Sequence, residues 1–170
     1  GTFLPVKSSL VSEHTMHREP FVITLDFLEK LRSRSGKLVA VGTTSVRTLE
    51  SLYYIGVRCI ESGVPGDVDQ WDPYCRKYEY SLDESLGALI DYLKDNSLNE
   101  LQLGTRIIIV PGYEFKVVDV LVTNFHQPQS TLLLLISAFV KGDWHKIYDF
   151  ALANDFRFLS YGDSSLLFKE

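Results

Sequence analysis

The sequence has little cysteine and no long apolar run. Its two cysteines, Cys59 and Cys75, are too few for a disulfide framework and lack the CxxC spacing of redox or zinc motifs. We interpret both as packing thiols. The longest apolar run, residues 132–140, is interrupted by Ser137 and is far shorter than the ~20 residues that cross a bilayer. No signal-peptide pattern opens the chain, so a cytoplasmic protein is expected.

The chain also lacks an excess of positive charge. Its net charge of −5 argues against a domain that holds nucleic acid by bulk electrostatics. RNA binding would therefore need a local basic patch or a contribution from elsewhere. The opening GTFLPV resembles the end of a strand, and no start methionine precedes it, which predicts that an N-terminal part is missing. At 170 residues the chain fits one domain with an ordinary globular composition.

Hydrophobic periodicity in the first part of the chain predicts alternating helices and strands. Leu25, Leu28 and Leu31 recur at helical spacing within residues 24–34, and Gly36 follows as a stop. KLVAVG is a short buried strand, and TTSVRTLESLYYIG returns to the helical period until Gly56. Strand, turn and helix in this order predict an α/β fold with parallel pairing.

Further elements follow in the second part. Residues 61–74 form an exposed loop, and Ser81 with Glu84 forms a capping box that opens a helix. RIIIV and FKVVDVLV are predicted strands, joined by PGYE as a hairpin turn. Two helices, 130–140 and 144–153, precede a last strand FRFLSY that turns at Gly162.

Polar residues gather at two junctions between a strand and a helix. GTTSVR contains Thr43, Thr44, Ser45 and Arg47, and the exposed amides of a helix start suit a carboxylate or a phosphate. The alternative is that Thr44 or Ser45 caps the helix. In NFHQPQST, Asn124 and His126 end a strand, while Ser130 and Thr131 start a helix. Because ligands bind at the carboxyl ends of strands in open α/β sheets, we favour a binding role for this second junction.

Two more segments are candidates for chemistry. EHTMHRE places His14, His17 and Glu19 close together, and histidine suits proton transfer near neutrality. A metal site and a solvated loop are the alternatives, but the HxxH spacing lacks the helical HExxH pattern. In FRFLSYGD, Arg157, Tyr161 and Asp163 alternate along the expected strand and can form a polar pocket wall or a simple strand end.

Taken together, these motifs resemble one family. GTFLPV, HTMHRE, VGTTSVRTLES, PGYEFKVVDVLVTNFHQPQSTLLLLISAF and FRFLSYGDSSLLF occur in the order found in the S-adenosylmethionine:tRNA ribosyltransferase-isomerases of queuosine biosynthesis. The resemblance leaves out roughly residues 53–102. It implies an α/β fold with a mixed, largely parallel sheet flanked by helices, within a larger two-domain protein whose β-barrel is absent here. Residues 1–170 would be the C-terminal part of the α/β catalytic domain, with an insertion at about 55–103.

The resemblance also implies an activity. The enzyme would move and isomerise the ribosyl part of S-adenosylmethionine onto 7-aminomethyl-7-deazaguanine in the tRNA anticodon loop. Epoxyqueuosine would form, with release of adenine and methionine. S-adenosylmethionine is a co-substrate in this scheme, and the expected protein is a monomer with no metal and no membrane contact.

The reaction needs a base next to the sulfonium and an acid near the departing adenine. His14, His17 and His126 match family motifs, with Glu19 as orienting group or base. Substrate contacts are expected from the polar residues of the other motifs: Thr43, Thr44, Ser45, Arg47, Asn124, Ser130, Thr131, Arg157, Tyr161 and Asp163. The competing functions are a noncatalytic RNA- or nucleotide-binding module on the same fold and a metal-dependent hydrolase built on the three histidines. The expected insertion, with Trp71, is either a packing elaboration or an added RNA contact.

Overall fold

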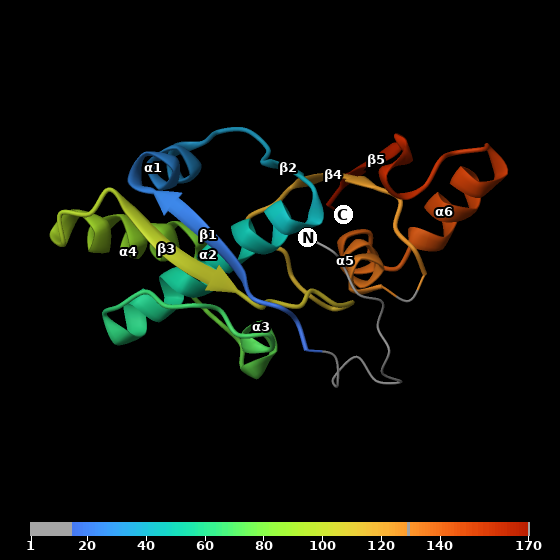
Figure 1. Ribbon diagram of the computed structural model, residues 1–170. Helices are drawn as coiled ribbons and strands as arrows, with labels where there is room; N and C mark the ends of the chain where they lie inside the picture. Colours follow the sequence, from blue (N-terminus) through green and yellow to red (C-terminus); the bar gives the residue numbers. More distant parts are fainter. Residues whose placement is uncertain (1–14, 129, 170) are drawn as a thin grey trace. The chain divides into compact units, whose positions relative to one another are not determined.

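The computed structural model describes residues 15–128 and 130–169, which form two compact units. The described part of unit 1 comprises Thr15, residues 38–46, 108–128 and 130–169, and unit 2 comprises Met16–Lys37 and Arg47–Ile107. Each unit has its own sheet, flanked by helices (Figure 1). His14 and the opening GTFLPV lie outside the described residues.

Unit 2 is built on two antiparallel strands. β1 (Glu19–Thr24) pairs with β3 (Glu100–Thr105) over their full length, and the two arrows lie side by side in Figure 1. Helix α1 (Leu25–Ser33) starts where Thr24 accepts a hydrogen bond from the amide of Phe27, and it packs on α4 (Leu82–Asp95). The predicted capping box of Ser81 and Glu84 opens α4 and is confirmed. A short helix, α3 (Asp72–Cys75), interrupts the predicted loop.

Helix α2 (Thr43–Ser62) continues past Gly56, so the predicted helix end at this glycine is wrong. The reason lies in the contact with α4. A Cβ on Gly56 would come within 2.2 Å of the carbonyl oxygen and of Oγ of Ser85. Ser85 is fully buried, and its hydroxyl donates to the carbonyl of Tyr53 at 2.7 Å. Gly56 thus serves the close approach of two helices rather than a helix end.

Unit 1 contains a three-stranded sheet in the order β2–β4–β5. β2 (Val39–Val41) runs parallel to β4 (Val120–Asn124), and β5 (Ser164–Phe168) runs antiparallel to β4. The predicted helices of this part are confirmed as α5 (Thr131–Phe139) and α6 (Trp144–Ala153). β2 was expected to be buried, but only Ala40 is. Exposed apolar side chains line one face of the sheet: Val39, Val41, Leu166 and Phe168.

The α/β class is confirmed, whereas several strand predictions are wrong. RIIIV is not a strand and forms no hairpin with β4, because β3 ends at Thr105 and pairs with β1 instead. FRFLSY is not a strand either; residues 159–161 form a 3₁₀ turn, η2 (Leu159–Tyr161), and β5 begins at Ser164. Parallel pairing is also less common than predicted, since two of the three strand pairs among the described residues are antiparallel.

The two cysteines differ in their burial. Cys59 is buried, as expected of a packing thiol, but Cys75 is exposed and its thiol lies 3.3 Å from the carbonyl oxygen of Trp71.

Within residues 15–128 and 130–169, none of the helices combines the length and apolar character needed to span a membrane.

Candidate active site

A carboxylate of unit 2 joins a histidine to a buried arginine. Oε1 of Glu19 lies 3.2 Å from Nε2 of His17 and 2.6 Å from Nη1 of Arg47. Arg47 also donates through Nε to the carbonyl of Ile107 at 2.9 Å. Since Glu19 opens β1 and Arg47 lies near the start of α2, the cluster ties a strand to a helix. His17, Glu19 and Arg47 are called the His–Glu–Arg cluster below.

Burial distinguishes the members of the His–Glu–Arg cluster. The side chains of Arg47 and Glu19 are 3% and 12% exposed, whereas that of His17 is 54% exposed. Burial lowers the pKa of Arg47 from its ordinary value, and the charge of Glu19 opposes this shift. The guanidinium therefore stays paired with the carboxylate, and the imidazole remains within reach of a ligand.

The cluster contains two buried polar atoms without a hydrogen bond in the part of the chain that the structure describes. Oε2 of Glu19 and Nη2 of Arg47 are buried and form no hydrogen bond among the described residues. Buried polar atoms without partners are uncommon in folded proteins and are costly. A buried charge cluster whose donor and acceptor have no partner among residues 15–128 and 130–169 is a candidate for a functional site.

In unit 1, polar residues follow the carboxyl ends of two paired parallel strands. Val41 of β2 lies opposite Val122 of β4, and the amide of Gly42 donates to the carbonyl of Val122 at 2.8 Å. Residues 43–45 follow β2 and start α2, while residues 125–131 follow β4 and lead into α5. Both predicted junctions thus lie at the same edge of one sheet, where open α/β sheets bind ligands.

The hydroxyls at the first junction are arranged differently from a helix cap. Oγ of Ser45 donates to the carbonyl of Val41 at 2.8 Å, and Thr43 is buried. Thr44 is exposed at the start of α2. Arg47, predicted to share their anionic ligand, belongs to unit 2 and pairs with Glu19. The sequence therefore grouped residues that the structure assigns to two separate units.

His126 occupies an aromatic setting at the second junction. Its Nε2 lies 2.9 Å from Oγ1 of Thr123, and its backbone amide donates to the hydroxyl of Tyr148 at 2.9 Å. The ring of neighbouring Phe125 packs edge-on against Tyr148 at 5.4 Å. Burial lowers the pKa of His126 from its ordinary value. The imidazole is consequently neutral at pH 7, a state that suits a base or a hydrogen-bonding group better than an acid.

The other residues predicted at the second junction take part in local structure. Ser130 caps α5 by accepting from the amide of Leu133 at 3.3 Å, and Thr131 is buried in the first turn. Oδ1 of Asn124 accepts from the hydroxyl of Ser164 at 2.9 Å.

The predicted alternation of Arg157, Tyr161 and Asp163 on one strand does not occur. Oδ2 of Asp163 accepts from the backbone amide of Arg157 at 2.6 Å, while Tyr161 is 71% exposed. These residues surround a turn, and only Arg157 and Asp163 meet.

Comparisons with known proteins decide the family. A family model described as Queuosine biosynthesis protein matches residues 1–167. The S-adenosylmethionine:tRNA ribosyltransferase-isomerase of Caulobacter vibrioides is 41% identical over 174 residues, covering 100% of this chain and 37% of the relative. The chain belongs to the queuosine biosynthesis protein family.

Other members agree with this placement. The S-adenosylmethionine:tRNA ribosyltransferase-isomerase of Rickettsia bellii is 36% identical across 100% of this chain, which covers 38% of that relative. The crystal structure of the S-adenosylmethionine tRNA ribosyltransferase of Thermotoga maritima matches with a TM-score of 0.56 and 33% identity, over 86% of this chain and 40% of the other. The present chain thus spans less than two fifths of the length of the curated relatives it matches.

The structure also adds residues that the sequence did not single out. Thr123 and Tyr148 contact His126, while Asp67 and Gln70 contact the residues that flank His17. Tyr148, Asp67 and Gln70 lie 22, 49 and 54 residues from their partners, so no local pattern marks these three, whereas Thr123 is only three residues from His126. Among the described residues, no three His, Cys, Asp or Glu side chains gather in a way that could hold a metal ion.

Proposed function

We propose that this chain is part of an enzyme that transfers and isomerises the ribosyl moiety of S-adenosylmethionine onto 7-aminomethyl-7-deazaguanine in tRNA. The product is epoxyqueuosine, with adenine and methionine released. Support comes from the family membership and from the names of the relatives, which include S-adenosylmethionine and tRNA. The reaction takes place where tRNA is modified, in the cytoplasm, with the tRNA anticodon loop as partner.

The observation that carries the proposal is the His–Glu–Arg cluster. The reaction requires removal of a proton from the carbon next to the sulfonium, and histidine is a side chain that commonly acts as a general base. His17 is exposed enough to meet substrate, and Glu19 lies 3.2 Å from its Nε2. When His17 takes up the proton, the carboxylate stabilises the imidazolium, and Arg47 holds the carboxylate in place. His17 is therefore our candidate base, with Glu19 as its orienting partner.

The strand ends of unit 1 provide the candidate substrate contacts. Thr44 and the amides at the start of α2 suit the methionine carboxylate or an RNA phosphate. His126, neutral because burial lowers its pKa, suits a hydrogen bond to the ribose or to adenine rather than proton donation. Asn124, Ser130 and Thr131 are proposed to bind ribose hydroxyls. Arg157, Tyr161 and Asp163, around the turn at residues 159–161, are proposed as further substrate contacts. His14 remains a second candidate base.

The test uses the product of the complete gene that encodes this sequence. It is incubated with S-adenosylmethionine and tRNA that carries 7-aminomethyl-7-deazaguanine. Mass spectrometry follows the modified nucleoside, and chromatography follows adenine. A nucleoside that gains the epoxycyclopentanediol, together with released adenine, is the expected result. Binding of tRNA without either product would instead favour the noncatalytic RNA-binding module.

Histidine variants test the assignment of the base. His17→Ala should lower kcat by about a hundredfold or more, because general-base catalysis contributes about 10²–10⁴-fold. His145 lies on exposed α6 and matches none of the motifs, so His145→Ala is the matched control and should turn over normally. Full activity in His17→Ala would remove His17 from the mechanism and leave His14 and His126.

A further inference from the structure

The residues on either side of His17 are bound by one segment of unit 2, residues 67–71, which leads into α3. Arg18 forms two hydrogen bonds with the carboxylate of Asp67, from Nε at 2.6 Å and from Nη2 at 3.1 Å. The backbone amide of Met16 donates to Oε1 of Gln70 at 2.8 Å. His17 therefore lies between two residues that segment 67–71 anchors.

Segment 67–71 is itself fixed to β3. The amide of Val68 donates to the carbonyl of Gly104 at 3.1 Å, and the carbonyl of Val68 accepts from the amide of Arg106 at 2.9 Å. These bonds form an isolated parallel bridge between Val68 and Thr105. Asp67 adds another contact, since its Oδ1 accepts from the amide of Gly104 at 2.7 Å.

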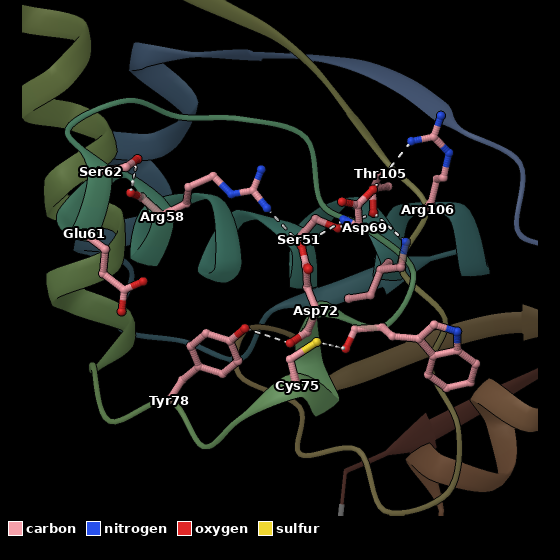
Figure 2. A network of polar contacts seen from close by, with 12 residues as sticks. Ser51, Arg58, Glu61, Ser62, Asp69, Asp72, Cys75, Tyr78, Thr105 and Arg106 are labelled. Atoms are coloured by element: carbon pink, nitrogen blue, oxygen red, sulfur yellow. Dashed lines mark hydrogen bonds and ion pairs between the residues drawn. The ribbon is translucent and has the colours of Figure 1, made fainter. Parts of the chain in front are cut away.

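The end of the segment is held as well. Figure 2 shows Asp72 beside Arg58, and the two side chains form an ion pair at 3.1 Å. The same carboxylate accepts from the amide of Asp69 at 2.9 Å, and the hydroxyl of Tyr78 donates to the carbonyl of Asp72 at 2.7 Å. Hydrogen bonds and an ion pair thus fix segment 67–71 to the rest of unit 2, so the segment can hold other residues in place.

Room for Arg18 depends on one glycine. A Cβ on Gly104 would lie 2.3 Å from Cζ of Arg18, so the guanidinium rests directly against the backbone of β3. Because the end of an arginine side chain moves easily, a larger residue at position 104 would displace the guanidinium from Asp67 and leave the strand in place.

A plain surface ion pair is the alternative explanation. The side chains of Arg18 and Asp67 are 40% and 35% exposed, and exposed pairs contribute little to stability. The bond to Arg18 nevertheless lowers the pKa of Asp67, as does the bond from Gly104, so the carboxylate is ionised and oriented at neutral pH. The pair of Arg18 and Asp67 therefore adds little to the stability of the fold. Its effect is to fix the position of Arg18, the residue that follows the candidate base His17.

We propose that segment 67–71 positions His17 and Glu19 for proton transfer, by holding Arg18 through Asp67 and Met16 through Gln70. The inference rests on the proposed function of the His–Glu–Arg cluster. Asp67, Gln70 and Arg18 are positioning residues that do not touch substrate. Small displacements of a reacting group lower rates steeply, because the reaction requires a defined approach.

The test compares Asp67→Asn and Gly104→Ala with a matched control. Arg32 and Asp83 form a second two-bonded pair in unit 2, at 2.7 and 2.8 Å, which joins α1 to α4 away from residues 16–19. Asp67→Asn and Gly104→Ala should lower kcat by about ten- to a hundredfold, while KM for both substrates stays within about twofold. Asp83→Asn should leave kcat within about twofold of the wild type, as expected for an exposed pair.

Hydrogen exchange provides a second readout that does not depend on turnover. Amides of residues 15–21 should exchange faster in Asp67→Asn and Gly104→Ala, with those of α1 and α4 unchanged. Unchanged exchange, or faster exchange with an unchanged kcat, overturns the positioning role. Normal turnover in both variants combined with an inactive His17→Ala overturns this inference but retains the proposed function. If the wild type makes no product, the proposed function fails, and the exchange rates still decide whether segment 67–71 holds residues 16–18.

Discussion

Replacing Arg47 with methionine tests whether the His–Glu–Arg cluster is buried as described. The substitution keeps a long apolar side chain but leaves the carboxylate of Glu19, only 12% exposed, without the guanidinium at 2.6 Å. Breaking a buried ion pair by removing one partner costs about 3–5 kcal/mol. Because Glu19 keeps some exposure and His17 stays beside it, we expect the lower end of that range, about 3 kcal/mol. With a urea m-value of about 2 kcal/mol/M, the unfolding midpoint would fall by about 1.5 M.

The assay follows urea unfolding through Trp71, which lies in unit 2, after Trp144 of unit 1 is replaced by phenylalanine. The double variant Glu19→Gln with Arg47→Met removes the buried charge and should unfold at a higher urea concentration than Arg47→Met alone. Arg32→Met breaks the exposed pair with Asp83 and is the control. An Arg47→Met midpoint no lower than that of Arg32→Met would refute the reasoning, because the pair would then behave as a solvated one.

Three further predictions concern other parts of the chain. Gly56→Ala forces α2 away from Ser85 and should destabilise the protein by about 1–3 kcal/mol in thermal unfolding, whereas Gly36→Ala, whose Cβ meets no atom within 4 Å, should not. Ser81→Ala removes the cap of α4 and should cost about 1 kcal/mol in urea unfolding; an unchanged midpoint would contradict the cap's contribution. His126 should make unit 1 less stable as the pH falls. Its folded-state pKa lies below the ordinary 6.5, so the unfolded chain binds the proton first as the pH drops through 6.5. Chemical unfolding at pH 7.5 and 5.5 should show this loss in the wild type and a smaller one in His126→Gln, and equal losses in both would count against it.

Helices with local end signals were the part of the fold that the sequence predicted well. Thr24 before α1 and the Ser81–Glu84 box before α4 satisfy helix amides through nearby side chains, so the signal and the structure lie within a few residues of each other. Gly56 failed as a stop signal because its reason is the distant Ser85, which no local pattern reveals.

Strands were predicted less well because their partners are distant. Ile107, Ile108 and Ile109 have high strand propensity, yet they are buried outside any strand, while the neighbouring β3 alternates less regularly. Its partner β1 lies some eighty residues earlier, and this pairing, rather than a hairpin with β4, fixes the register. Residues 107–109 are buried without pairing as a strand, and β3 pairs as a strand without a strong strand pattern. Both results depend on tertiary packing, which the local sequence does not specify.

The candidate site was partly within reach of the sequence. The sequence predicted that His17 and Glu19 lie close together, with the carboxylate able to orient a histidine, and the structure has Nε2 of His17 3.2 Å from Oε1 of Glu19. Arg47 was grouped with Thr43, Thr44 and Ser45 because helix position alone suggests a shared ligand. Its contact with Glu19 depends on how β1 and α2 pack, which periodicity does not specify.

The chain passes between the two units more than once, since residues 38–46 of unit 1 lie between the two segments of unit 2. This order affects folding during synthesis. Unit 2 has all its described strands and helices once Ile107 has been made, whereas β2 of unit 1 pairs with β4, which begins at Val120. Domains tend to fold as units in the order in which they leave the ribosome. The segment 38–41 must therefore wait, flanked by chain that is already folded, until its sheet partner emerges. During that interval its backbone has no strand partner from β4, and an unpaired strand with the apolar side chains of Val39 and Val41 is open to pairing with the wrong segment.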